Sequence, residues 1–128
     1  MDTVPDSITP VRLGEVLLVT FPTDLTDELA VRTQRDLSAM VARGGIRGVV
    51  IDVSAMWVVD TFICRVLADT AAAVKLLAAE TVVAGLRPAI AMTLVELGMT
   101  LSGLRTALNT EAALARLGAG ARPSMEKP

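Results

Sequence analysis

The sequence predicts an α/β fold with a mixed, mostly parallel sheet and about four helices. Strand-like apolar runs alternate with segments of helical spacing in the order β-β-α-β-α-β-α-β-α, and such alternation requires parallel strands joined by crossovers. Hydrophobic residues make up 52% of the 128 residues but aromatic residues only 2%, which favours an aliphatic, layered core over an aromatic-rich β-sandwich. A chain of this length forms one domain with a substantial core.

The first elements are a hairpin and a helix. Residues 11–13 and 16–19 flank Gly14-Glu15, a pattern typical of a short β-hairpin. From Thr23 to Arg43 the apolar positions follow helical spacing, with Thr23 or Thr26 as the N-cap and Gly44-Gly45 as the stop. The positions expected to face the core are Leu25, Leu29, Thr33, Leu37, Met40 and Val41.

Three further strand–helix pairs follow. Residues 48–54 form an apolar, β-branched run, as expected for a central strand covered on both faces. Residues 61–79 predict a helix with inward positions Phe62, Val66, Leu67, Val74 and Leu77. The remaining elements are a strand at residues 80–86, a helix from Pro88 to Gly98 with Ile90, Leu94 and Leu97 as its apolar stripe, an extended segment at 104–108, and a last helix from its cap Asn109 to Leu117.

Residues 11–118 are expected to form the folded domain. Residues 1–10 are polar and predicted to be flexible, and residues 119–128, rich in Gly, Pro and charge, are predicted to be disordered. The start of the chain lacks the basic residues and apolar block of a signal peptide. No charge-free apolar stretch approaches the roughly 18–20 residues of a spanning helix. We therefore expect a cytoplasmic protein that does not contact a membrane.

Charge and reactive side chains argue against several classes of protein. The net charge is −2 and no basic run occurs, so a nucleic-acid surface is not expected. The chain has no histidine and one cysteine, Cys64, which we expect to be a small buried hydrophobe. No glycine-rich phosphate loop follows a strand. We expect no enzyme activity, no metal site and no cofactor, whereas a mean hydropathy of +0.56 indicates self-association or a protein partner.

Asp60 and Thr61 stand where an apolar strand region gives way to a helix. Partners and ligands of open α/β sheets often meet the domain at the carboxyl ends of the strands. One interpretation of the pair is ordinary helix capping by Asp60. The other is a phosphorylation switch, because a phosphate on Thr61 would add about −1.5 to −2 charges beside the positive end of a helix, which tolerates negative charge. The pattern alone leaves both interpretations open.

Three segments of the sequence resemble the STAS family, the sulfate-transporter and anti-sigma-factor-antagonist domains. They are GVVIDVSAMWVVDTFICRVL, KLLAAETVVAGLRPAIAMTLVELGM and LRTALNTEAALARL, and the resemblance extends from Val11 to Leu117. The second segment resembles the stressosome branch, above all its RsbS-type scaffold proteins and next its RsbR-type C-terminal domains. RsbS-type proteins typically carry serine where this chain has Thr61. RsbR-type proteins carry a large N-terminal sensory domain, and because this chain begins almost at its first strand we expect the RsbS type.

This resemblance implies a regulatory role with named phosphoacceptors. In the family, a serine/threonine switch kinase phosphorylates the residue after the aspartate at the strand–helix joint, and the matching residue is Thr61, with Asp60, Phe62 and Arg65 on the switch surface. A second family phosphoacceptor matches Thr93, for which a helix threonine bonded back to a carbonyl is the other interpretation. The implied partners are an RsbT-like kinase, RsbR-like STAS co-antagonists and a phosphatase. The implied function is to hold the kinase in a stressosome-type complex until phosphorylation of Thr61 releases it, which controls an alternative sigma factor in a stress response.

Two other functions stay open. A soluble anti-sigma factor antagonist would bind an anti-sigma kinase directly, although Phe62-Ile63-Cys64 fits poorly with the small residues of such proteins. A small-ligand module would bind a nucleotide or lipid anion at Arg87, beside the start of the Pro88 helix. An ordinary surface charge is the alternative interpretation of Arg87.

Overall fold

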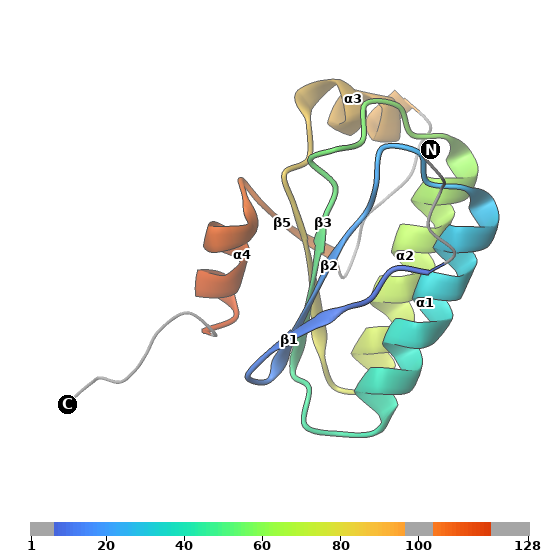
Figure 1. Ribbon diagram of the computed structural model, residues 1–128. Coiled ribbons are helices and arrows are strands. Elements are labelled where there is room, and N and C mark those ends of the chain that lie inside the picture. Colours follow the sequence, from blue (N-terminus) through green and yellow to red (C-terminus); the bar gives the residue numbers. More distant parts are fainter. Residues whose placement is uncertain (1–6, 97–103, 119–128) are drawn as a thin grey trace, which may run out of the picture.

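The structure, a computed structural model, describes residues 7–96 and 104–118. Within these residues it contains five strands and four helices in the predicted order, which confirms the fold class (Figure 1). The predicted Leu97 and Gly98 at the end of the third helix, most of the expected flexible N-terminus and the expected disordered tail lie outside the described residues. The elements are β1 (Val11–Leu13), β2 (Val16–Thr20), α1 (Asp27–Ala42), β3 (Gly48–Asp52), α2 (Thr61–Leu76), β4 (Glu80–Ala84), α3 (Pro88–Glu96), β5 (Leu104–Ala107) and α4 (Thr110–Arg116).

The sheet order follows the chain order, with β1 antiparallel to β2 and the other neighbours parallel. The three central strands are in register, so that Thr20, Asp52 and Ala84 lie side by side at their carboxyl ends. This carboxyl edge is the upper end of the domain in Figure 1, where α3 and the loop between β3 and α2 also lie. The register therefore brings the Asp60-Thr61 joint to the edge at which α/β sheets meet their partners.

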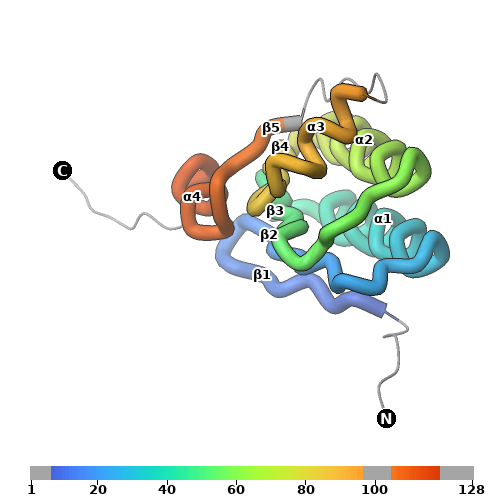
Figure 2. The backbone as a smooth tube through the Cα atoms, turned by 90° about the horizontal axis from the view of Figure 1, so that it is seen from above, coloured from blue at the N-terminus to red at the C-terminus, as the bar shows by residue number. Residues whose placement is uncertain are grey.

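Helices cover the two faces of the sheet unequally (Figures 1 and 2). The paired helices α1 and α2 cover one face, and their buried residues, among them Leu37, Val41, Val66 and Val74, pack in one cluster with alternate strand residues. The opposite face is covered by α4, which packs Ala113 and Leu117 against a smaller set of strand residues, Val16, Val50, Val82 and Ala84. Burial on both faces explains the continuous apolar run of β3.

Side-chain caps set the starts of the helices. Thr26 Oγ1 accepts a hydrogen bond from the Leu29 N–H at 3.1 Å, so α1 begins at Asp27, and of the two predicted caps Thr26 is confirmed and Thr23 is not. Thr23 instead donates its hydroxyl to the Ala55 carbonyl at 3.1 Å. Asn109 Oδ1 accepts from the Ala112 N–H at 2.8 Å, which confirms the predicted cap of α4. These short polar side chains satisfy amide groups that a helix start leaves unpaired.

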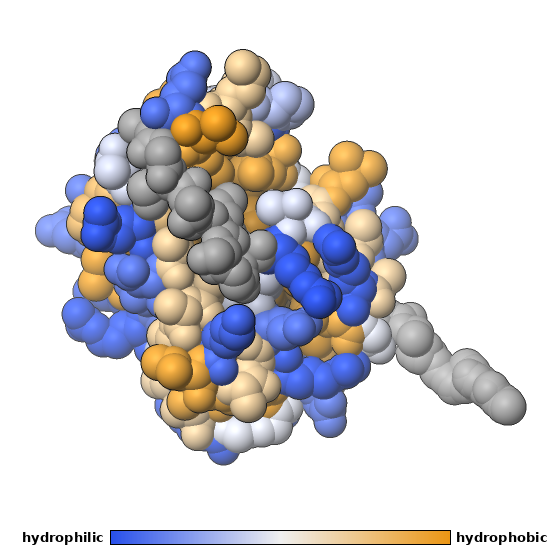
Figure 3. Space-filling view, turned by 180° about the vertical axis from the view of Figure 1, so that it is seen from behind, coloured by the Kyte–Doolittle hydropathy of each residue, from blue (hydrophilic) through white to orange (hydrophobic). Residues whose placement is uncertain are grey.

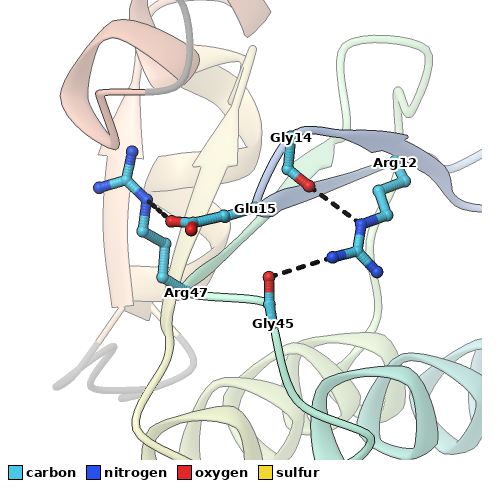
Figure 4. A network of polar contacts seen from close by, with 5 residues as sticks. All are labelled: Arg12, Gly14, Glu15, Gly45 and Arg47. Atoms are coloured by element: carbon cyan, nitrogen blue, oxygen red, sulfur yellow. Dashed lines mark hydrogen bonds and ion pairs between the residues drawn. The ribbon is translucent and has the colours of Figure 1, made fainter.

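Two arginines hold the opposite end of the domain, at the amino ends of β2 and β3 (Figure 4). Arg12 Nε donates to the Gly14 carbonyl at 3.0 Å and its Nη2 donates to the Gly45 carbonyl at 3.2 Å, which joins two turns that are distant in sequence. Arg47 Nε lies 3.0 Å from Glu15 Oε1. These contacts stabilise an end of the domain remote from Thr61.

Candidate functional site

Asp60 caps α2 and thereby fixes the position of Thr61. The Asp60 backbone is extended, with φ −104° and ψ 177°, and its Oδ1 accepts a hydrogen bond from the Ile63 N–H at 2.9 Å. Its carbonyl accepts from the Cys64 N–H at 3.1 Å. The capping interpretation of Asp60 is therefore confirmed. It does not compete with a role for Thr61, because the cap uses the Asp60 carboxylate and leaves the threonine hydroxyl without a hydrogen-bond partner among the described residues.

Thr61 is the first residue of α2 and is exposed. The residues that α2 buries are Ile63, Cys64, Val66, Leu67, Thr70, Ala71 and Val74, and helical spacing places Thr61 on the opposite side of the helix. No acidic residue occurs in the first turn of α2. A dianion on the Thr61 hydroxyl would meet the positive end of the helix and would disturb no core contact. The local structure can therefore carry a phosphate at this position without unfolding.

Apolar side chains next to Thr61 are exposed. In the loop between β3 and α2, Met56 and Val59 are buried, whereas Trp57 is 66% and Val58 83% exposed. Phe62 is 40% exposed. Exposed apolar residues also occur on α3, and Figure 3 shows apolar side chains on the surface at the upper end of the domain. A cluster of exposed apolar side chains is typical of a protein-interaction surface.

The predicted inward positions Phe62 and Leu77 are wrong, because both side chains are about two-fifths exposed. Ile63 occupies the core position instead, which leaves Phe62 on the α1 side of the buried stripe. There Phe62 lines an open hollow of about 380 Å³ together with residues of the first turns of α1, namely Asp27, Glu28, Val31, Arg32 and Arg35. Leu77 lies just beyond the last turn of α2, where the core contacts of the helix end.

The predicted switch-surface residues lie together around Thr61. Asp60 precedes it as the cap, Phe62 follows it, and Arg65 is one helical turn further on and exposed. Arg65 makes no hydrogen bond or ion pair with any residue that the structure describes. A free guanidinium and a capping carboxylate therefore flank the hydroxyl.

Thr93 lies on α3, and its hydroxyl, unlike that of Thr61, is hydrogen-bonded. It is half-buried in α3, and its Oγ1 donates a hydrogen bond to the Ala89 carbonyl at 2.9 Å. This is the back-bonded geometry that was the alternative interpretation of Thr93. The Thr93 hydroxyl is thus engaged within its own helix, whereas the Thr61 hydroxyl is free.

Arg87 joins the start of α3 to the loop before α2. Its Nε donates to the Ser54 carbonyl at 3.1 Å, and its Cζ lies 3.5 Å from the centroid of the Trp57 ring, a cation–π contact. An anion bound at Arg87 would share the guanidinium with the Ser54 carbonyl and the Trp57 ring. Sequence reasoning missed Trp57, although its signal was available: it is the single tryptophan of an aromatic-poor chain and stands just before Asp60.

Cys64 is fully buried, as predicted. Burial, and next the negative charge of Asp60, raise the pKa of the Cys64 thiol above its ordinary value. The folded state therefore favours the neutral thiol, and this contribution to stability is complete below the ordinary thiol pKa and lost as pH rises through the higher folded-state pKa.

We predict that the free energy of unfolding falls between about pH 8 and about pH 10, and that it falls less in Cys64→Ala. Urea denaturation at both pH values measures this, and equal falls in the two proteins would contradict it.

The described part of the chain has neither a metal-binding cluster nor a membrane-spanning helix. Residues 7–96 and 104–118 contain no group of three or more His, Cys, Asp or Glu side chains placed to hold a metal ion. None of the helices in these ranges is long and apolar enough to span a bilayer.

The sequence matches the STAS domain family over residues 7–113, and the chain belongs to that family. Domains of this family are non-enzymatic and regulatory. The membership agrees with the fold and with the capped strand–helix joint at Asp60.

Particular relatives place the chain within the family. A serine-to-glutamate variant of RsbS from Moorella thermoacetica is 32% identical, with 87% of this chain and 94% of that chain covered and a TM-score of 0.78. A chain from the structure of the stressosome, described as a signal integration and transduction hub, is 33% identical, with 86% and 96% covered and a TM-score of 0.76. The RsbT co-antagonist protein RsbRD of Bacillus subtilis (strain 168) is 37% identical over 68 residues, which are 53% of this chain and 24% of that protein. The chain thus spans about a quarter of the length of this relative. It is related to the RsbS and RsbR proteins of the stressosome, as the resemblance implied.

Proposed function

We propose that this protein is a scaffold of a stressosome-type complex that holds an RsbT-like serine/threonine switch kinase inactive. The kinase phosphorylates Thr61 and is thereby released, and the free kinase acts on the downstream regulator of an alternative sigma factor in a stress response. A phosphatase returns Thr61 to its free form. RsbR-like STAS co-antagonists and further copies of this chain complete the assembly, which we place in the cytoplasm.

One observation carries the proposal: the Thr61 hydroxyl is free and exposed, in a segment that also exposes apolar side chains. A kinase needs a free hydroxyl oxygen, and the exposed Thr61 hydroxyl makes no hydrogen bond among the described residues, whereas the Thr93 hydroxyl donates to the Ala89 carbonyl. A bound partner needs apolar area, and Trp57, Val58 and Phe62 supply it beside the same oxygen. The similarity to RsbS and to a chain of the stressosome supports this partner class.

The release step follows from electrostatics. A phosphate on Thr61 would place about two negative charges in the surface that the kinase covers. Charge buried at an interface without a partner is costly, so the bound state is penalised more than the free state. In the free state the phosphate remains in water, with the α2 N-terminus and the Arg65 guanidinium nearby to offset its charge. Phosphorylation therefore weakens binding and spares the fold.

Site mapping tests the proposal directly. We expect the cognate switch kinase and ATP to transfer one phosphate to Thr61, located by mass spectrometry of the intact and digested protein. Thr61→Val, which keeps the side-chain shape and removes the hydroxyl, should lose this label and should still retain the kinase. Thr93→Val is the matched control and should be labelled at Thr61 like the wild type. Equal labelling of Thr61→Val and wild type would refute the proposed switch.

A further inference from the structure

We propose that Arg87 holds Trp57 as a preformed hot spot of the docking patch, defined as Trp57, Val58 and Phe62, and that the occupant of this patch is the switch kinase. This inference rests on the proposed function and deepens it, because it names the surface and the positioning residue through which the kinase is held.

The loop that carries Trp57 is anchored by buried side chains and hydrogen bonds. Met56 and Val59 are buried on either side of Trp57 and Val58, so the loop turns two apolar side chains inward and two outward. The Met56 N–H donates to the Val53 carbonyl at 3.0 Å, which closes a turn at the start of the loop. The Thr23 hydroxyl also donates to the carbonyl of the neighbouring Ala55 at 3.1 Å. The backbone beneath the indole is therefore fixed.

Arg87 fixes the indole itself. Its guanidinium stacks on one face of the Trp57 ring, and its Nε donates to the Ser54 carbonyl of the same loop. Ser54 is held in turn, because its N–H donates to Asp52 Oδ1 at 2.9 Å and its Cβ packs against Gly85. Two contacts from one side chain thus bind both the ring and the backbone of the loop. Trp57 nevertheless remains 66% exposed.

Such an arrangement lowers the entropic cost of binding. A tryptophan that is ordered before the partner arrives loses little rotamer freedom on association. Tryptophan and arginine are also the side chains most enriched among the residues that carry interface energy. Trp57 and Arg87 together therefore form the part of the docking patch on which affinity should depend most.

The position of the patch identifies its occupant. Trp57, Val58 and Phe62 are exposed within six residues that include Thr61, so a protein that transfers phosphate to the Thr61 hydroxyl approaches this segment. A second copy of this chain on the same patch would block access to that hydroxyl. The kinase is therefore the occupant consistent with a phosphoacceptor in the middle of the patch.

The first experiment needs no kinase. Trp57 is the only tryptophan, so its fluorescence reports on the stack alone. In Arg87→Met, which keeps an unbranched apolar stem and removes the guanidinium, we expect acrylamide to quench Trp57 at least about twofold more efficiently. Arg43→Met, which changes an exposed arginine at the C-terminal end of α1, is the matched control and should match wild type. Unchanged quenching in Arg87→Met would overturn the inference.

The second experiment measures kinase affinity in a Thr61→Val background, where phosphorylation cannot release the kinase. We expect Trp57→Ala and Arg87→Met each to raise the kinase Kd at least about tenfold, Trp57→Phe to recover part of the loss, and Arg43→Met to have no effect. Thermal melting of each variant checks that the domain stays folded.

The outcomes separate the inference from the proposed function. If the Thr61→Val protein without further substitutions binds no kinase, the proposed function fails. The docking patch then has no identified partner, whatever the fluorescence shows. If the Thr61→Val protein binds kinase and both docking variants bind equally well, only the inference fails. A loss of self-association with unchanged kinase affinity would assign the patch to a second copy of the chain and would also overturn the inference.

Discussion

Thr61→Glu should weaken retention of the switch kinase at least about tenfold, a free-energy change of about 1.4 kcal/mol. The substitution places a permanent negative charge in the docking patch, where a bound partner would strip its water without supplying a counter-charge. The fold should be spared, because a carboxylate in the first turn of α2 interacts favourably with the helix N-terminus. We expect the melting temperature to change by no more than about 2 °C. Kinase pull-down and calorimetry measure the two quantities.

The matched control for this prediction is Thr61→Gln. Glutamine has the size and shape of glutamate and no charge, so it should retain the kinase nearly as well as wild type. Equal losses in Thr61→Gln and Thr61→Glu would mean that bulk rather than charge releases the kinase. The electrostatic account of the switch would then be wrong, although Thr61 would still lie in the binding surface.

Gly85→Ala should have the largest effect on stability, a loss of about 2–4 kcal/mol in the free energy of unfolding. Gly85 has φ +75°, a conformation that disfavours every residue with a Cβ. A Cβ at this position would also lie 2.8 Å from Ser54 Cβ and 3.2 Å from Ser54 Cα, so the backbone of the loop would have to move. Because Ser54 also accepts the Arg87 hydrogen bond, the Trp57 fluorescence should change as well. Urea denaturation and emission spectra measure both effects.

Gly14→Ala separates the backbone cost of a positive φ from the cost of the steric contact with Ser54. Gly14 has φ +63°, but a Cβ there would meet no atom within 4 Å. It should therefore show only the backbone cost, about 1–2 kcal/mol, with unchanged Trp57 emission. If Gly85→Ala were no more destabilising than Gly14→Ala, the contact with Ser54 would relax freely, and the loop would be less firmly anchored than its hydrogen bonds indicate.

The parts of the structure that depend on neighbouring residues were predictable. The Asp60 and Asn109 caps, the hairpin and the order of the elements follow from short patterns, since the atoms that interact are within a few residues of each other. Thr61 was found at its joint for the same reason. The sequence left the cap of α1 open between Thr23 and Thr26 because both threonines fit a cap, and only the fold assigns Thr23 to the Ala55 carbonyl.

The surroundings of Thr61 were less predictable because they are set by distant residues. Helical spacing gives the period of a buried stripe but not which side of α2 meets α1, and for this reason Phe62 was placed in the core although it lies at its margin. The stack of Arg87 on Trp57 joins residues 30 positions apart, and no local pattern encodes it. Resemblance to a family pointed to Thr61, but it did not indicate how the loop beside Thr61 is held.

The unequal covering of the sheet gives the domain two levels of cooperativity. The short helix α4 rests on a few strand side chains, with Leu117 seated so closely over Gly48 that a Cβ there would lie 2.7 Å away. The long pair α1 and α2 shares a much larger buried cluster with the other face. Detachment of α4 should therefore require less free energy than global unfolding. In such a partly open state the strands and α2 with Thr61 would stay ordered, so α4 can detach without disturbing the carboxyl edge of the sheet.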